Sequence, residues 1–200
     1  MKQNVMIACL ASVLCVLAVS TGAAESLLLK DDFANGGSST RRAIRGDWKI
    51  ADGVASCTQD DELYKKFKNH GPIIFYDPPF DDATVRFVFR AEKAKAVVFT
   101  ANGEDGHVFR VSWAPRGMNV RAFPPDATEK SISVGQAEKP LQQGVWIPVQ
   151  VTLKGPKAVV KVGDGDPQVY EHQSFARPKT NISVGFSFGS LEIKDLAVSP

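Results

Sequence analysis

Apolar and polar residues alternate along most of the chain after residue 25, and this period of two constrains the fold more than any other feature. In one segment, Val85, Phe87 and Phe89 fall on one side while Arg86 and Arg90 fall on the other. Successive side chains of a β-strand point to opposite faces, so the alternation predicts a strand with one buried face. The pattern recurs over residues 107–113, 145–154, 158–162, 182–188 and 191–198.

Short connections rich in glycine and aspartate separate these predicted strands. The turn residues 102–106 fit a hairpin, and Gly189-Ser190 fits a second, tighter one. The alternation changes phase near Asp195, which predicts a β-bulge. One helix is expected over 60–69, where two large apolar residues are four positions apart. About ten short, mostly antiparallel strands at regular spacing predict an all-β sandwich.

The first 24 residues have the pattern of a cleaved export signal. Lys2 precedes an apolar stretch of 15 residues, Val5–Val19, and small residues follow up to Ala24. The stretch is shorter than the roughly 20 residues that span a bilayer, so no membrane anchor is expected. We therefore expect a signal peptide over 1–24 and a single β-sandwich domain over 25–200, exported to the periplasm or the extracellular space.

Removal of this segment changes what the composition implies. It would leave 176 of the 200 residues and change the formal net charge from +2 to +1. Cys9 and Cys15 would be lost, so Cys57 would have no partner for an internal disulfide and is expected to be a buried thiol. Nucleic-acid binding relies on clustered Lys and Arg, and because the near-neutral chain has no basic block, no nucleic-acid partner is expected.

The order of several short strings resembles a known family of secreted domains. The strings are Asp31-Asp32-Phe33, residues 46–54, residues 80–87, Gly144-Val145-Trp146, residues 179–186 and residues 191–196. Together they resemble the 3-keto-disaccharide-hydrolase-type domain family over nearly all of the chain after the signal. The resemblance implies a concanavalin A-like jelly-roll sandwich of two antiparallel sheets, and it implies 3-keto-glycoside hydrolysis as one function.

Catalytic residues are sought first among the carboxylates. Retaining β-glucanases of this fold carry a Glu-x-Asp-x-x-Glu run on one strand, which brings the nucleophile and the acid–base residue to the same sugar. The sequence contains no such run, so glucanase chemistry is not expected. A 3-keto-glycoside hydrolase needs a base whose pKa lies near the working pH, as that of histidine does. The candidate catalytic residues are His107, His172, Lys179 and Asp47.

The three histidines, His70, His107 and His172, could in principle form a zinc site, but they lack the local spacing of zinc ligands. The acidic turn 164–166 lacks the further oxygen ligands of a calcium loop. We therefore expect no metal and no cofactor. Regular alternation sets His107 and Arg110 on opposite faces of a sheet, so they share a site only if a bulge or an edge position intervenes.

The polar side chains opposite the apolar rows suggest a sugar-binding face. They are Arg86, Arg90, Arg110, Ser112, Asn119, Arg121, Trp146, Gln150 and Thr152. If their strands are neighbours, an aromatic ring could stack on a pyranose while amide and guanidinium groups bond its hydroxyls. The predicted ligand-binding residues are Arg86, Arg110, Trp146 and Gln150, and the alternative is an ordinary solvated sheet face.

Three functions follow from these observations. The sequence favours a non-catalytic role in binding carbohydrate outside the cytoplasm. Hydrolysis of 3-keto-glycosides and a structural role in an envelope or surface assembly are the alternatives. The sequence leaves the oligomeric state open.

Overall fold

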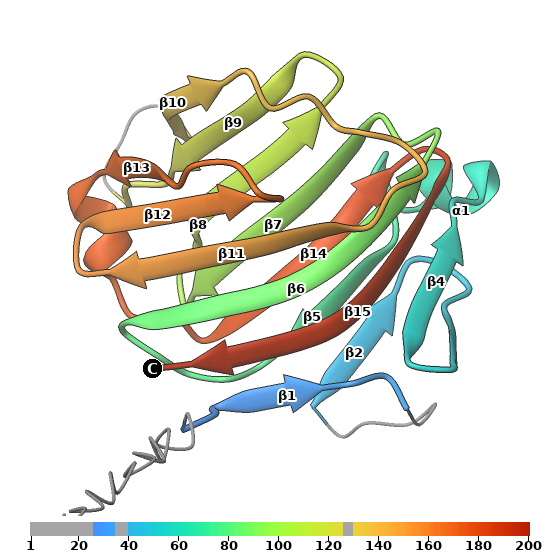
Figure 1. Cartoon of the computed structure of the whole chain (residues 1–200), viewed down its shortest axis with the longest axis horizontal. Coiled ribbons are helices and arrows are strands. Elements are labelled where there is room, and N and C mark those ends of the chain that lie inside the picture. Colours follow the sequence, from blue (N-terminus) through green and yellow to red (C-terminus); the bar gives the residue numbers. More distant parts are fainter. Residues whose placement is uncertain (1–25, 35–39, 126–129) are drawn as a thin grey trace, which may run out of the picture.

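Two antiparallel sheets face each other across a shared core, so the predicted all-β sandwich is confirmed (Figure 1). The computed structural model describes residues 26–34, 40–125 and 130–200. The predicted signal peptide over 1–24, with Cys9 and Cys15, lies outside the described residues. No helix within the described ranges is long and apolar enough to cross a membrane.

The first sheet has eight strands, seven of them in the order β13-β12-β11-β6-β15-β4-β3, with β1 paired to β15. Their bounds are β1 Leu29–Asp31, β3 Lys49–Ala51, β4 Val54–Thr58, β6 Ala83–Glu92, β11 Ile147–Lys154, β12 Lys157–Val162, β13 Gln168–Glu171 and β15 Ser190–Ser199.

The second sheet has seven strands in the order β10-β9-β8-β7-β14-β5-β2. Their bounds are β2 Arg41–Ile44, β5 Ile73–Tyr76, β7 Ala96–Gly103, β8 Gly106–Ala114, β9 Gly117–Ala122, β10 Ile132–Ala137 and β14 Asn181–Ser187. In Figure 1 the long strands β7, β8 and β14 lie behind β6, β11 and β12 of the first sheet. Two short helices, α1 (Asp61–Lys66) and the 3-10 helix η1 (Gln173–Ala176), join strands at the rim.

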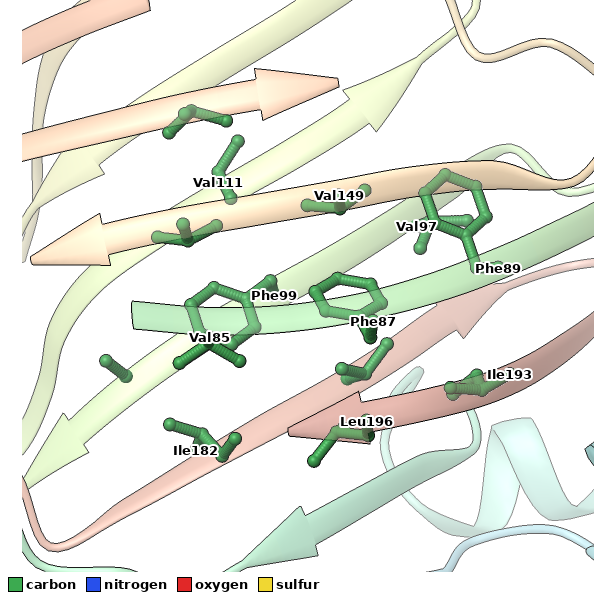
Figure 2. Close-up of a cluster of buried hydrophobic side chains, with 14 of the residues drawn as sticks. Val85, Phe87, Phe89, Val97, Phe99, Val111, Val149, Ile182, Ile193 and Leu196 are labelled. Atoms are coloured by element: carbon green, nitrogen blue, oxygen red, sulfur yellow. The ribbon is translucent and has the colours of Figure 1, made fainter. Parts of the chain in front are cut away.

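The core forms where the inward rows of the two sheets meet. Phe87 of β6 packs against Phe99 of β7, with ring centroids 5.8 Å apart, and against Trp113 of β8 at 6.4 Å. Figure 2 shows Val85, Phe87 and Phe89 of β6 among side chains from both sheets. All of these residues are at most 1% exposed, as the period-two pattern requires.

Several local predictions are confirmed, and one is wrong. The turn at 102–106 joins β7 to β8 as a hairpin. Near Asp195, which has φ 53°, the register with β6 shifts between Lys194 and Ala197, as the expected bulge requires. Gly189-Ser190 does not close a hairpin, because it carries the chain from β14 in the second sheet to β15 in the first.

The expected helix over 60–69 forms only as α1. Its start is fixed by Asp60, whose side-chain carboxylate accepts a hydrogen bond from the Leu63 backbone N–H at 2.7 Å. Lys68 and Asn69 have φ of 55° and 61°, which is left-handed backbone and ends the helix early.

Candidate functional site

The single polar face expected from the sequence does not form, because its residues divide between two sheets. Arg86 and Gln150 are opposite one another on β6 and β11, where the Arg86 Nε donates to the Gln150 Oε1 at 3.1 Å. Arg110 and Arg121 are opposite one another on β8 and β9 of the second sheet. The two sets therefore lie on the opposite outer faces of the sandwich.

Trp146, the predicted stacking platform, lies beside the first sheet and already has charged partners. The Arg90 guanidinium carbon is 4.8 Å from the ring centroid, and the Lys194 Nζ is 4.6 Å from it. Two cations of the chain thus compete for the π surface that a sugar would need.

A polar pocket of about 600 Å³ opens on the same face. Its lining includes Asp47, Lys49 and Glu92, together with the hydrogen-bonded ion pair Arg90–Glu192. Because this arginine and carboxylate are paired, the pocket offers no uncompensated guanidinium group.

Cys57 also borders this pocket and is buried, as expected. Burial is the main cause that raises the pKa of its thiol to about 11, and Asp47 adds to the effect. The thiol therefore stays protonated at neutral pH and is a poor nucleophile.

A bulge on the second sheet brings His107 and Arg110 together. The β7–β8 register pairs Ala101 with Phe109 and then Asn102 with His107, so Val108 is the extra residue. His107 consequently points outward beside Arg110. A bulge between His107 and Arg110 is what the sequence analysis required for these two residues to share a site.

The hydrogen bonds at His107 define its protonation. Arg110 Nη2 lies 2.6 Å from His107 Nε2, and because a guanidinium group can only donate, Nε2 is the acceptor. The other nitrogen, Nδ1, then carries the proton and donates to Asn102 Oδ1 at 2.5 Å. Desolvation and the charge of Arg110 lower the pKa of His107 to about 4, so the ring is neutral at pH 7.

Asn102 anchors this arrangement to the neighbouring strand. Its Nδ2 donates to Asn181 Oδ1 on β14 at 2.7 Å. On the other side, Arg110 Nε donates to Thr100 Oγ1 at 3.3 Å. Asn102 and Thr100 are only 8% and 3% exposed although they point away from the core, so other side chains cover them.

Phe123 completes the cluster at the end of β9. The Arg110 guanidinium carbon lies 5.1 Å from the centroid of its ring, and the His107 ring meets it edge-on at 5.0 Å. The Phe123 carbonyl accepts from Arg177 Nη1 at 2.8 Å, which fixes the backbone there. Phe123 therefore holds Arg110 in place.

Arg121 and Asn119 extend the polar surface along β9. Arg121 donates from Nε to Ser131 Oγ at 2.8 Å and from Nη2 to the Ser131 carbonyl at 3.0 Å. Asn119 donates to Ser133 Oγ at 2.9 Å. Asn119 also borders a groove of about 640 Å³ that runs past Ser112 to the β8–β9 turn. We call His107, Arg110, Asn119, Arg121 and Phe123 the arginine site.

The other predicted catalytic residues do not join this site. His172 caps η1, because its Nδ1 accepts from the Ser174 backbone N–H at 3.1 Å. Lys179 is 1% exposed and donates to the Asp81 carbonyl at 2.6 Å, and its burial lowers its pKa. With Asp47 in the first-sheet pocket, the four candidates occupy separate places.

The remaining histidine also has a local partner. His70 Nδ1 lies 2.9 Å from the Phe67 carbonyl at the exposed end of α1. Within the described parts of the chain, no group of three or more His, Cys, Asp and Glu side chains is arranged to hold a metal ion.

Residues 185–189 form a Gly-x-Ser-x-Gly string, which marks the nucleophile of many hydrolases. A nucleophile elbow places its serine between a strand and a helix. Here Ser187 ends β14, and the chain passes directly into β15. The string therefore lacks the elbow's setting.

Comparison with known proteins defines the class of fold. No protein-family model and no curated protein sequence matches the chain. A carbohydrate binding module, CBM66 from Bacillus subtilis, superimposes with a TM-score of 0.60 at 9% identity, covering 80% of this chain and 96% of the module. A sialidase gives 0.62 at 12% identity, covering 86% of this chain but 18% of the sialidase.

A third solved structure, congerin II with lactose and MES bound, gives a TM-score of 0.52 at 8% identity, covering 62% of this chain and 96% of congerin. Identities this low establish the fold and nothing finer. The chain therefore has a two-sheet β-sandwich fold that it shares with these solved structures.

Proposed function

We propose that this protein is exported and binds carbohydrate, without catalysis, through the arginine site on the outer face of the second sheet. The observation that carries the proposal is the rigid polar network in which Arg110, Arg121 and Asn119 are each tied to a neighbouring side chain. Side chains held in place before binding lose little rotamer entropy when a ligand arrives.

The chemistry of the site suits a sugar. Planar guanidinium and amide groups donate several hydrogen bonds in fixed directions, which suits hydroxyl-rich ligands. The groove beside Ser112 and Asn119 begins two residues along β8 and β9 from Arg110 and Arg121, so a ligand longer than one sugar could reach from the arginines into it. Two structural neighbours, a carbohydrate binding module and a lactose-liganded congerin, support the proposal.

Calorimetry with the purified protein and a panel of neutral and acidic oligosaccharides tests the proposal. Asn119→Ala and Arg121→Gln should weaken binding, whereas Trp146→Ala and Gln150→Ala on the first sheet should leave it unchanged. The opposite pattern would move the site to the first sheet. Failure of every sugar to bind at millimolar concentration would refute carbohydrate binding and favour a structural role.

Hydrolysis of 3-keto-disaccharides is the competing function implied by the family resemblance. Its candidate residues do not meet around one substrate: Asp47 borders the first-sheet pocket, His172 caps η1 and Lys179 is buried. Incubation with 3-keto-disaccharides and their parent sugars separates the two functions. Turnover that is lost in His107→Ala would overturn the non-catalytic proposal.

Export is tested by the mass of the protein recovered outside the cytoplasm of an expression host. Cleavage after Ala24 should give a chain that begins at Glu25. An uncleaved chain retained in the cytoplasm would contradict this part of the proposal.

A further inference from the structure

Arg110 and Arg121 place two positive charges directly opposite one another on neighbouring strands. Like charges in this arrangement destabilise an antiparallel pair unless something compensates them. Desolvation lowers the pKa of the Arg110 guanidinium, and the charge of Arg121 lowers it further, so the two groups interact.

No carboxylate of the described residues compensates this pair. The ion pairs among these residues include Arg41–Asp31, Arg42–Asp77, Lys65–Glu62, Arg90–Glu192 and Arg177–Asp105, and Arg110 and Arg121 are in none of them. The nearby Asp105 is 3.9 Å from Arg177, and its side chain is 81% exposed. Among the described residues, Arg41, Arg42, Arg90 and Arg177 each have a carboxylate partner, whereas Arg110 and Arg121 do not.

The hydrogen bonds of Arg110 and Arg121 leave the Nη1 group of each side chain free to donate. Arg110 uses Nε and Nη2 on Thr100 and His107, and Arg121 uses Nε and Nη2 on Ser131. Neither Nη1 has a hydrogen-bond partner among the described residues. Each guanidinium group is therefore held in place through Nε and Nη2 and still has free N–H donors on Nη1. Carboxylate oxygens accept charge-assisted hydrogen bonds from guanidinium N–H donors.

We propose that the arginine site selects sugars that carry an anionic group, which binds between Arg110 and Arg121. This inference rests on the proposed carbohydrate-binding function and names its ligand class. A sugar carboxylate or a sugar sulfate would supply the required charge. The neutral His107 adds no charge of its own, so recognition depends on the two arginines.

The test compares trigalacturonate, its methyl ester and a neutral galactose trimer by calorimetry in 50 mM salt, with a sulfated galactose trimer as a fourth probe. The free acid should bind at least about tenfold more tightly than the ester, because a charge-assisted hydrogen bond is lost on esterification. Raising the salt to 500 mM should narrow this preference. Tighter binding of the sulfated sugar than of the carboxylate would support the inference and identify sulfate as the group.

Variants locate the effect. Arg121→Gln should lower the affinity for the acid much more than the affinity for the ester, so that the preference for the acid is lost, and Arg121→Lys should retain part of that preference. Arg42→Gln is the matched control, since it removes one exposed arginine at the far edge of the same sheet. Thermal melts show whether each variant is folded.

The outcomes separate the two proposals. Equal binding of acid, ester and neutral sugar would refute anion selection and leave carbohydrate binding intact. An acid preference that survives Arg121→Gln would place the anion elsewhere and overturn the inference. Binding of none of the four sugars would overturn both proposals.

Discussion

Replacing Arg110 by glutamine should raise the pKa of His107 from about 4 toward its ordinary value of 6.5. Desolvation is the larger cause of the depressed pKa, and the guanidinium charge beside Nε2 is the second. Two unit charges about 4 Å apart repel by about 1 to 4 kcal/mol when the effective dielectric constant lies between those of water and a protein surface. Since 1.36 kcal/mol corresponds to one pKa unit, and desolvation partly remains, we expect a pKa of about 5 to 6 in the variant.

The same titration makes stability depend on pH. Between pH 6.5 and about 4 the unfolded chain protonates this histidine while the folded protein does not, so the unfolded state binds more protons. The stability of the fold therefore falls as the pH drops through this window, and it is unaffected above pH 7. The shift sets an upper limit of about 3.4 kcal/mol, which solvent screening at this exposed side chain reduces to about 1 to 2 kcal/mol.

Two measurements check these values. NMR titration of the imidazole Cε1–H from pH 3 to pH 8 gives the pKa in the wild type and in Arg110→Gln, with Arg42→Gln as the control. Urea denaturation at pH 7 and pH 4.5 gives the stability change, which His107→Gln should reduce. A wild-type pKa near 6.5, or the same pKa in Arg110→Gln and wild type, would refute the hydrogen-bond network inferred at His107.

Three further predictions concern the fold and are read from urea denaturation at pH 7. Phe87→Ala should cost about 3 to 5 kcal/mol, because it opens a cavity between the sheets, and a loss under 1 kcal/mol would contradict the packing. Tyr76→Phe should cost about 1 to 3 kcal/mol by removing the buried 2.7 Å bond to Asp31, and a neutral effect would argue against that bond. Gly189→Ala should cost at least about 2 kcal/mol, since its Cβ would lie 2.0 Å from the Glu92 carbonyl oxygen at φ +60°, and an unchanged midpoint would exclude this close approach.

The positions of the strands could be predicted because burial of one sheet face and the geometry of the strand backbone both produce a two-residue alternation of apolar and polar side chains. Val85, Phe87 and Phe89 alternate in the sequence and are buried together between the sheets. The bulge at Asp195 was equally accessible, since a change of phase in the alternation has few other physical explanations. These features depend only on local sequence.

The pairing of strands could not be obtained in the same way. Gly189-Ser190 has the composition of a hairpin turn, yet the following strand pairs with β6, β4 and β1 in the other sheet. A tight turn favours a hairpin but does not determine which edge is available when the next strand forms. Long-range packing determines which strand becomes the partner, and the residues around a turn carry no information about that packing.

The site was predictable only in part for the same reason. Arg86 and Arg110 have equivalent positions in their strands, and only the sheet order separates them. The sequence indicated that His107 and Arg110 could share a face only if a bulge or an edge position intervened. It did not indicate that a bulge forms there. Phe123 and Asn102 were missed, because one follows the end of a strand and the other was assigned to a turn.

Outward-facing polar residues on the central strands of the second sheet are buried. Across the second sheet, register pairs join Ser183 to Thr100, Thr100 to Arg110, and Arg110 to Arg121. Ser183 and Thr100 are 2% and 3% exposed, whereas polar residues on a solvated sheet face remain accessible to water. Burying polar groups and facing two arginines together both cost stability, and neither arrangement contributes to the core. A ligand that accepts from both guanidinium groups would offset this cost, which is why we place the binding function on this face.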